Sequence, residues 1–157
     1  MIFIENIIHD EILKVFILSM LPITELRFSI PYGINYYSLS PLYVVSISII
    51  GNILIGIVVI YILGPFMNIL KKIGVFRFMI EYIFNKTKIR GHIIDKRKFY
   101  GLIIFVGIPL PFTGVWTGAL AAYLFNLSKQ NSVIAITLGS LISATIVTTL
   151  TLVAISI

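Results

Sequence analysis

Hydrophobic positions form long apolar stretches along the chain, and two of these stretches are interrupted. No residue from Phe28 to Leu70 is charged, and Leu42–Phe66 is long enough to cross a bilayer once as a helix. Residues 130–157 are also uncharged and predict a second full span. Residues 99–127 are uncharged but are broken by prolines and glycines. The pattern predicts two straight membrane helices and broken apolar segments before each of them.

The broken segments share a Pro/Gly motif. The first reads PITELRFSIPYG from Pro22 to Gly33, and the second reads PLPFTGVWTG from Pro109 to Gly118. Irregular backbone at membrane depth is tolerated only where protein or a water-filled cavity surrounds it, and interrupted segments at matching positions of two halves are typical of transporter binding sites. We therefore expect two re-entrant hairpins.

Composition supports a membrane protein. The 157 residues are 59% hydrophobic and only 11% charged, against about 25% charged in a typical soluble domain. A single membrane domain covering residues 1–157 is the expected organisation. The chain has no cysteine and two histidines far apart in sequence, so we expect no metal site and no cofactor. Acidic residues occupy the place of a basic n-region, so no cleaved signal peptide is expected.

Positive charge is concentrated between the two halves. Residues 71–98 hold nine of the twelve Lys and Arg residues, opposed only by Glu81 and Asp95. The positive-inside rule predicts that this connector is cytoplasmic and that the chain lies in the cell (inner) membrane. Apolar and charged residues alternate at helical spacing over 69–86, which predicts an interfacial helix attracted to anionic lipid. The connector has no nucleic-acid-binding motif, so no nucleic-acid partner is expected.

The two halves repeat weakly. Pro22 aligns with Pro109 at an offset of 87, and Gly51-Asn52 aligns with Gly139-Ser140 at 88. The expected fold is an all-α integral membrane protein with repeats at about 12–70 and 99–157, each a broken hairpin followed by a full transmembrane helix.

Two topologies fit this repeat. Re-entrant hairpins give inverted halves, whereas fully crossing segments give parallel halves with four spans. Lys129 is cytoplasmic only in the inverted arrangement, which we favour.

Small residues recur every four positions on both straight helices. Such stripes let membrane helices approach closely, and packing alone explains them. Asn52 is the member that we also consider for binding. The stripes are Ser48, Asn52 and Gly56 in the first half, and Ser140, Ala144 and Thr148 in the second.

Glu25 and Arg27 form the one charged pair inside a predicted membrane element. An ionisable residue at membrane depth costs roughly 2.5–3.5 kcal/mol, which makes it a functional-site hypothesis. Glu25 can carry a proton, and Arg27 can hold a phosphate or carboxylate through its planar fork. The alternative is that Arg27 neutralises Glu25 and locks the hairpin. On a continuous helix the two side chains point apart, so a direct pair requires non-helical backbone.

The second hairpin offers hydroxyls, one indole and freed backbone groups instead of charge. Half-helix N-termini and unwound carbonyls can coordinate ions or anionic groups. The alternatives are that Trp116 is an interfacial anchor and that the glycines serve packing. Tyr32, Tyr36 and Tyr37 either line a ligand pocket or form an aromatic belt. The predicted substrate- or proton-binding residues are Glu25, Arg27, Pro22, Pro31, Asn52, Pro109, Pro111, Thr113, Gly114, Trp116, Thr117 and Gly118.

These motifs resemble the putative small multi-drug export protein family over nearly the whole chain. Phe28 and Val115 stand where the family has small residues, and both changes can narrow a pocket. More distantly, the plan resembles DedA-like proteins, which implies opposed re-entrant hairpins and a lipid or polyprenyl-phosphate substrate. The acidic and arginine residues of the DedA-like second motif have no counterpart between Pro109 and Lys129.

The expected function is therefore a small multi-pass transporter that exports small molecules and is coupled to protons through Glu25. The alternatives are a DedA-like translocase of a phosphorylated lipid carrier and a non-transporting membrane scaffold or assembly factor. We expect no enzymatic activity, because one buried carboxylate without a nucleophile–base pair makes a poor active site. A homodimer is a further expectation, since a chain this small needs a second copy to enclose a pathway.

Overall fold

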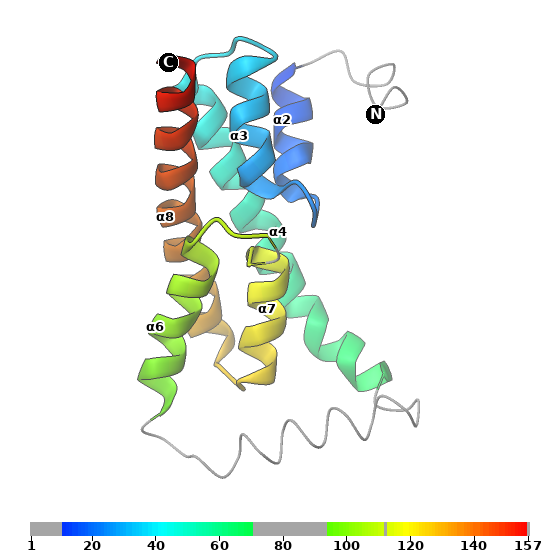
Figure 1. Cartoon of the computed structure of the whole chain (residues 1–157). Coiled ribbons are helices and arrows are strands. Elements are labelled where there is room, and N and C mark those ends of the chain that lie inside the picture. Colours follow the sequence, from blue (N-terminus) through cyan, green and yellow to red (C-terminus); the bar gives the residue numbers. More distant parts are fainter. Residues whose placement is uncertain (1–10, 71–93, 112, 157) are drawn as a thin grey trace.

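The computed structural model describes residues 11–70, 94–111 and 113–156, and within these ranges every regular element is a helix (Figure 1). The predicted all-α class is therefore confirmed for this part of the chain. The helices are α2 (Glu11–Met20), α3 (Glu25–Asn35), α4 (Pro41–Leu70), α6 (Ile94–Gly107), α7 (Val115–Leu124) and α8 (Lys129–Ser156).

The two long helices, α4 and α8, are the two predicted spans. Pro41–Met67 has a hydropathy of 2.5 and Lys129–Ser156 has one of 2.0. Only 28% and 39% of their most apolar windows are buried inside the protein, whereas the core helix of a soluble protein is mostly buried. Most of their apolar surface therefore faces outward, as expected for helices that contact lipid.

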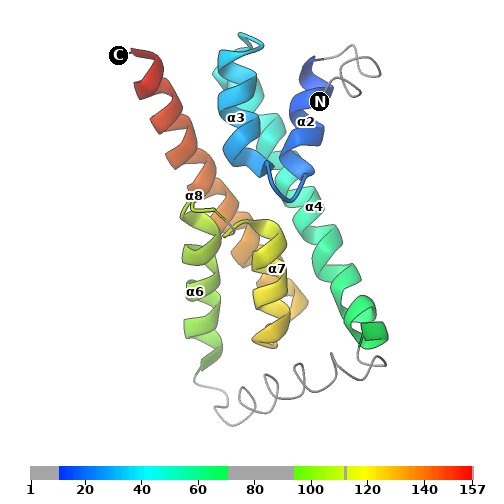
Figure 2. The same cartoon turned by 45° about the vertical axis from the view of Figure 1, so that its right-hand side comes forward.

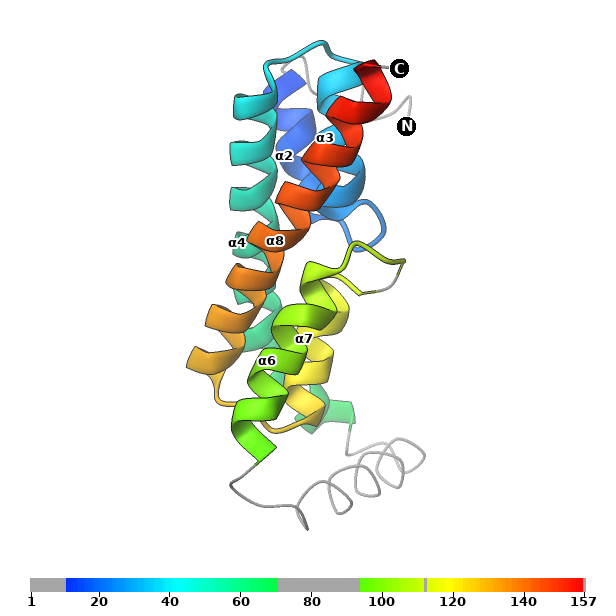
Figure 3. The ribbon, with the colours of Figure 1, turned by 60° about the vertical axis from the view of Figure 1, so that its left-hand side comes forward.

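Each long helix is preceded by a pair of short helices. Figure 1 shows α2 and α3 side by side along one half of the molecule, and α6 and α7 along the other half. The turn between α2 and α3 and the turn between α6 and α7 face each other near the middle of the molecule (Figures 1 and 3). The long helices α4 and α8 cross and splay apart towards their ends (Figure 2).

The first break is narrower than the motif predicted. Only the turn between Met20 and Glu25 is irregular, and it contains Pro22, whereas Pro31 and Gly33 lie inside α3. Proline removes one helical hydrogen bond, but packing against neighbouring helices sustains a membrane helix across it. Gly33 allows that packing, because a Cβ there would lie 2.8 Å from a Val44 methyl group.

The second break agrees with the motif at Pro109, Pro111 and Gly114, but Gly118, which the motif also marked as a break, lies inside α7. Helix α6 ends at Gly107 and α7 begins at Val115, so Pro109, Pro111 and Gly114 all lie in the connection. Proline disfavours helical backbone at the residue before it, which explains why α6 stops here.

Past α7, Asn126 has a φ of 55°, and the Leu127 N–H donates to the Ala122 carbonyl, which closes the helix with a left-handed cap.

Buried side chains form two separate cores, one beside each hairpin. The first joins α2 and α3 to the beginning of α4 and the end of α8, and includes Leu26 and Val147. The second joins α6 and α7 to the end of α4 and the beginning of α8, and includes Val106 and Ile136.

Two glycines seat the first helix of each hairpin on a long helix. A Cβ at Gly51 would overlap Ser19 and lie 3.0 Å from the Phe16 carbonyl oxygen. A Cβ at Gly139 would lie 2.7 Å from Val106 Cβ and 3.0 Å from the Ile103 carbonyl oxygen. Helix α2 therefore packs on α4 as α6 packs on α8. The predicted interfacial helix after residue 70 lies outside the described residues and stays a prediction.

Candidate functional site

The facing turns of the two hairpins enclose a cavity of about 420 Å³. Eight of the twelve predicted site residues line it, and the other four (Pro31, Asn52, Thr113 and Gly118) do not. Ile23, Thr24 and Phe28 also line the cavity. The cavity wall includes Pro22, Glu25, Arg27, Pro109, Pro111, Gly114, Trp116 and Thr117.

Glu25 stands at the start of α3 in an unusual backbone conformation. Its φ is 46°, in the left-handed region that costs a non-glycine residue about 1–2 kcal/mol. The side chain is only 5% exposed. Strain of this kind persists where the surrounding structure imposes it and is frequent at functional sites.

The Glu25 carboxylate caps a helix in the other hairpin. It accepts hydrogen bonds from the backbone N–H groups of Val115 and Trp116, in the first turn of α7. The N-cap residue of α7 is Gly114, which has no side chain to do this. Free N–H groups and the helix dipole both favour an anion at this position.

Gly114 is required for this contact. A Cβ at residue 114 would overlap the Glu25 carboxylate, so the absence of a side chain makes the room that the carboxylate occupies. The φ of Gly114 is −81°, which any residue can adopt. The glycine is therefore needed for close approach and not for its backbone freedom.

Arg27 also bonds to the second hairpin. Its Nη1 donates to the Leu110 carbonyl, and its Nη2 donates to Thr113 Oγ1 at 3.0 Å. Its Nε is buried and has no hydrogen-bond partner among the described residues. Glu25 and Arg27 therefore take separate partners across the hairpin contact, as expected for positions i and i+2 of a helix.

Thr113 fixes the loop that receives Arg27. Its Oγ1 lies 2.8 Å from the carbonyl oxygens of Ile108 and Leu110. Thr113 thus belongs to the site by holding the loop in shape, although it does not line the cavity.

Trp116 makes a contact in the opposite direction. Its indole Nε1 donates to the carbonyl of Met20, the last residue of α2, at 3.1 Å. Each hairpin therefore donates a side-chain hydrogen bond to a backbone carbonyl near the end of the other hairpin's first helix. Trp116 therefore lies at the contact between the two hairpins.

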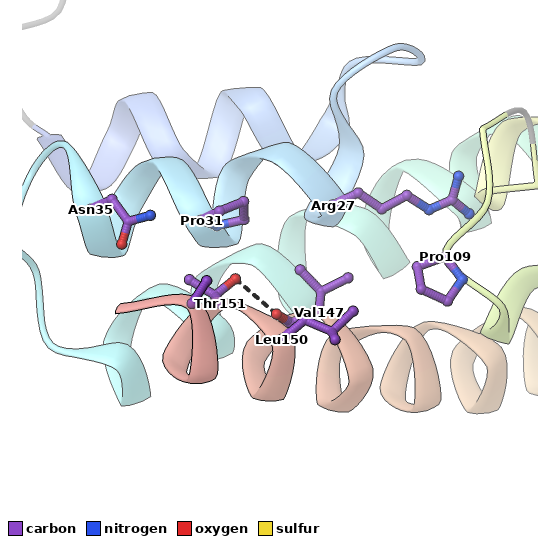
Figure 4. Close-up of a pocket in the computed structure, with 8 residues that line it drawn as sticks. Arg27, Pro31, Asn35, Pro109, Val147, Leu150 and Thr151 are labelled. Carbon is purple, nitrogen blue, oxygen red and sulfur yellow. Dashed lines mark hydrogen bonds between the residues drawn. The ribbon is translucent and has the colours of Figure 1, made fainter. Parts of the chain in front are cut away.

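Two further cavities share walls with the central one. Arg27 and Pro109 also line a cavity of about 360 Å³ between α3 and α8, together with Pro31 (Figure 4). Trp116 and Thr117 also line an apolar cavity of about 550 Å³ between α4 and α7. Arg27 and Trp116 therefore stand at the two boundaries of the central cavity.

Asn52 and Gly118 lie outside these cavities. Asn52 is 1% exposed, and its Nδ2 donates to Ser140 Oγ at 3.3 Å where α4 crosses α8. A Cβ at Gly118 would lie 2.6 Å from a Val106 methyl group, so Gly118 serves packing. Ser48, Gly56 and Ala144 of the small-residue stripes are buried as well, which agrees with the packing interpretation.

The tyrosines form an aromatic cluster along α3 and just past its end. Phe28 stacks on Tyr32 at a centroid distance of 5.2 Å, and Tyr32 stacks on Tyr36 at 4.8 Å. Tyr37 contacts Tyr32 edge-on. Of these four rings only Phe28 lines the central cavity, and its narrowing effect on that pocket stays a prediction.

Sequence reasoning missed the backbone acceptors. The carbonyls of Met20 and Leu110 complete the contact between the hairpins, yet a carbonyl carries no sequence signal. The sequence offered one indication of these acceptors. Arg27 and Trp116 carry hydrogen-bond donors, and buried donors need acceptors.

The comparisons agree with the resemblance read from the motifs. The model of the family described as "Putative small multi-drug export protein" matches residues 25–146, which is most of the chain. The matched range contains Glu25, Arg27 and the whole second hairpin. No curated protein and no solved structure matches this chain.

Proposed function

We propose a transport function from the premise that this chain belongs to the putative small multi-drug export protein family. In this proposal the chain exports small molecules through the cavity between its two hairpins, and Glu25 couples export to proton movement. It acts as a transporter and not as an enzyme.

One observation carries the proposal: the Glu25 carboxylate is buried in a cavity and holds the two hairpins together through the Val115 and Trp116 N–H groups. A neutral carboxyl group is a weaker acceptor than a carboxylate, and a neutral group loses its attraction to the α7 dipole. Protonation of Glu25 would therefore loosen the contact between the hairpins. Binding of a proton would thus change the shape of the cavity, which is what coupling of export to proton movement requires.

We further propose that the halves are inverted repeats with re-entrant hairpins. The Gly51 contacts with Phe16 and Ser19 recur at Gly139 with Ile103 and Val106, at offsets of 87 or 88 residues. Asn52 bonds Ser140, its own equivalent at an offset of 88. A residue touches its own repeat equivalent when both lie near a symmetry axis. This contact therefore supports a pseudo-two-fold axis through the crossing of α4 and α8.

In this proposal the end of the molecule that carries the basic connector faces the cytoplasm of the inner membrane. The cavity at Arg27 then lies towards the outside, and the apolar cavity at Trp116 lies towards the cytoplasm. Movement of one hairpin and its core against the other would open these cavities in turn. A second copy of the chain would enclose the lipid-facing side of the pathway.

Reconstituted vesicles test coupling. Vesicles that contain the wild-type chain and a pH-sensitive dye should show proton flux when ethidium is added. Glu25→Gln should abolish this flux, because an amide cannot exchange a proton. Glu11→Gln is the matched control, since Glu11 is an exposed carboxylate at the start of α2, away from the cavity. Equal flux in both variants would contradict proton coupling through Glu25.

A second candidate is a translocase of a phosphorylated lipid carrier. The observation that favours it is the buried Nε of Arg27, which has no partner in the part of the chain that the structure describes, on a side chain that borders two cavities. A guanidinium with an unused donor suits a phosphate oxygen. Arg27→Ala should then abolish flipping of a polyprenyl phosphate in vesicles, and Arg27→Lys should retain part of it. If both Glu25 and Arg27 variants are silent while folded, a scaffold or assembly role replaces both proposals.

A further inference from the structure

A separate cleft is lined by residues of α6 and by residues at the end of α7. Figure 1 shows that these two helices lie side by side in the half of the molecule that holds the second hairpin. The volume of the cleft is about 510 Å³. None of the residues predicted for the transport site lines it. Its walls include Arg97, Lys98, Gly101, Phe105, Ala121 and Phe125.

We propose that this cleft binds one anionic phospholipid, with an acyl chain along the cleft and the headgroup phosphate between Arg97 and Lys98. This inference rests on the membrane location of the chain and is independent of what the chain transports.

The cleft has one charged end and an apolar interior. Arg97 and Lys98 lie in the first turns of α6, whereas Phe105 lies eight residues further along the same helix, roughly 12 Å away at 1.5 Å per residue. Ala121 on α7 also lines the cleft. An amphiphile with a negative headgroup matches this distribution, whereas a soluble anion would leave the apolar part empty.

The cationic end is built into the structure. Lys98 Nζ donates to the Phe125 carbonyl at 3.0 Å, which holds the ammonium group at the end of α7. Arg97 is exposed beside it and offers a planar fork that suits phosphate. Basic pockets between membrane helices on the cytoplasmic side are typical sites for anionic headgroups.

Gly101 forms an open part of the cleft. A Cβ at this position would meet no atom within 4 Å, so a larger side chain can enter the cleft without disturbing the protein. Gly64 on α4 offers an equally open position outside the cleft. Replacement of either glycine by leucine gives a matched pair of variants, and both should fold because leucine is the better helix former.

Native mass spectrometry of the delipidated full-length chain tests the proposal. The chain is titrated with dioleoyl phosphatidylglycerol, and in parallel with dioleoyl phosphatidylcholine. The wild type should retain one phosphatidylglycerol molecule in preference to phosphatidylcholine. Gly101→Leu should weaken phosphatidylglycerol binding about tenfold, because it overfills the cleft. Arg97→Gln should weaken it about fivefold and reduce the preference over phosphatidylcholine.

Gly64→Leu should bind as the wild type does. The proposal is overturned if the two glycine variants behave alike, if phosphatidylcholine binds as well as phosphatidylglycerol, or if Arg97→Gln keeps the full preference. The same spectra count protein copies in each particle. A Gly101→Leu variant that loses copies and keeps its lipid would assign the cleft to a contact between chains and would also overturn the proposal.

Discussion

At the scale of single residues, the most informative arrangement is the capping of one hairpin by a carboxylate from the other. A serine or aspartate at position 114 would satisfy the N-terminus of α7 locally. The chain instead has Gly114 there and supplies Glu25 from the first hairpin, in a left-handed backbone conformation. The local alternative would cap α7 without involving the first hairpin. The observed arrangement therefore adds a link between the two hairpins, which a local cap at residue 114 would not provide.

The pH response of Trp116 tests this coupling without any substrate. Trp116 is the chain's single tryptophan, its backbone N–H bonds the Glu25 carboxylate, and its indole bonds the Met20 carbonyl. Protonation of Glu25 should change the indole environment, so Trp116 fluorescence should follow one titration. Glu25→Gln should remove that transition and Glu11→Gln should preserve it. A transition that survives in Glu25→Gln would show that another group titrates.

A Gly114→Ala substitution tests the steric requirement. The added Cβ should displace the Glu25 carboxylate and break its bonds to α7, at a cost of about 2 kcal/mol for hydrogen bonds to a buried charged group. The free energy of unfolding is measured by titration with dodecyl sulfate, read by Trp116 fluorescence. Gly101→Ala is the control, because its Cβ meets no atom and removal of a helical glycine stabilises by about 0.5–1 kcal/mol. Equal stability of the two variants would contradict the proposed role of Gly114.

The side chains of the site could be predicted from the sequence, but their hydrogen-bond partners could not. An acid, an arginine and two Pro/Gly motifs in apolar sequence are rare enough to mark the cavity, and eight of the twelve marked residues line it. The partners of Glu25 and Arg27 include backbone groups of Val115 and Leu110, which any residue would supply. Phe28 was recognised only as a departure from the family pattern.

At the scale of the elements, glycine contacts seat the hairpins on the long helices. The Gly139 contact involves Val106 Cβ and a backbone oxygen, which cannot move without shifting α6. The Gly51 contact involves the Ser19 hydroxyl, which can rotate, and a backbone oxygen at 3.0 Å. The two contacts occupy equivalent positions in the two halves, but the Gly51 contact can adjust more readily than the Gly139 contact.

This difference gives a ranked prediction. Gly139→Ala should lower the free energy of unfolding by about 2 kcal/mol, within the range for overpacking a tight contact. Gly51→Ala should lower it by about 1 kcal/mol, because the Ser19 side chain can give way. Gly64→Ala on α4 should have no cost, because its Cβ meets no atom. Dodecyl sulfate titration of the three variants measures the order, and a reversed order of Gly51 and Gly139 would contradict the packing described.

Element boundaries were predictable where a strong signal had no competitor. The two spans followed from uncharged length, and the second break followed from two prolines close together. The first break was overestimated because Pro31 and Gly33 were read as helix-breaking. Burial of the neighbouring Ser29, Ile30 and Ile34 sustains α3 through both positions. Tertiary packing thus overrides local propensity, which a motif alone cannot reveal.

At the scale of the whole molecule, the two cores make the halves separable. Each hairpin has its own core, and the same two long helices contribute to both cores with opposite ends. Among the described residues, the contacts that join the hairpins directly include the polar ones of Glu25, Arg27 and Trp116. A change at these contacts can therefore move one hairpin relative to the other without unfolding either core.

Membrane topology distinguishes re-entrant hairpins from four full crossings. Ser40 and Ser128 are both exposed, Ser40 directly before α4 and Ser128 directly before α8, and the chain has no native cysteine. Re-entrant hairpins put these two positions on opposite sides of the membrane, because α4 crosses once between them and the α6–α7 hairpin returns to the side from which it enters. Single cysteines at the two positions should therefore react with a membrane-impermeant maleimide from opposite sides, with position 40 reached from outside and position 128 only after the membrane is opened. Labelling of both from outside would mean that the broken segments cross fully. The halves would then be parallel, and the shared polar contact of the hairpins could not serve as the pivot of alternating access.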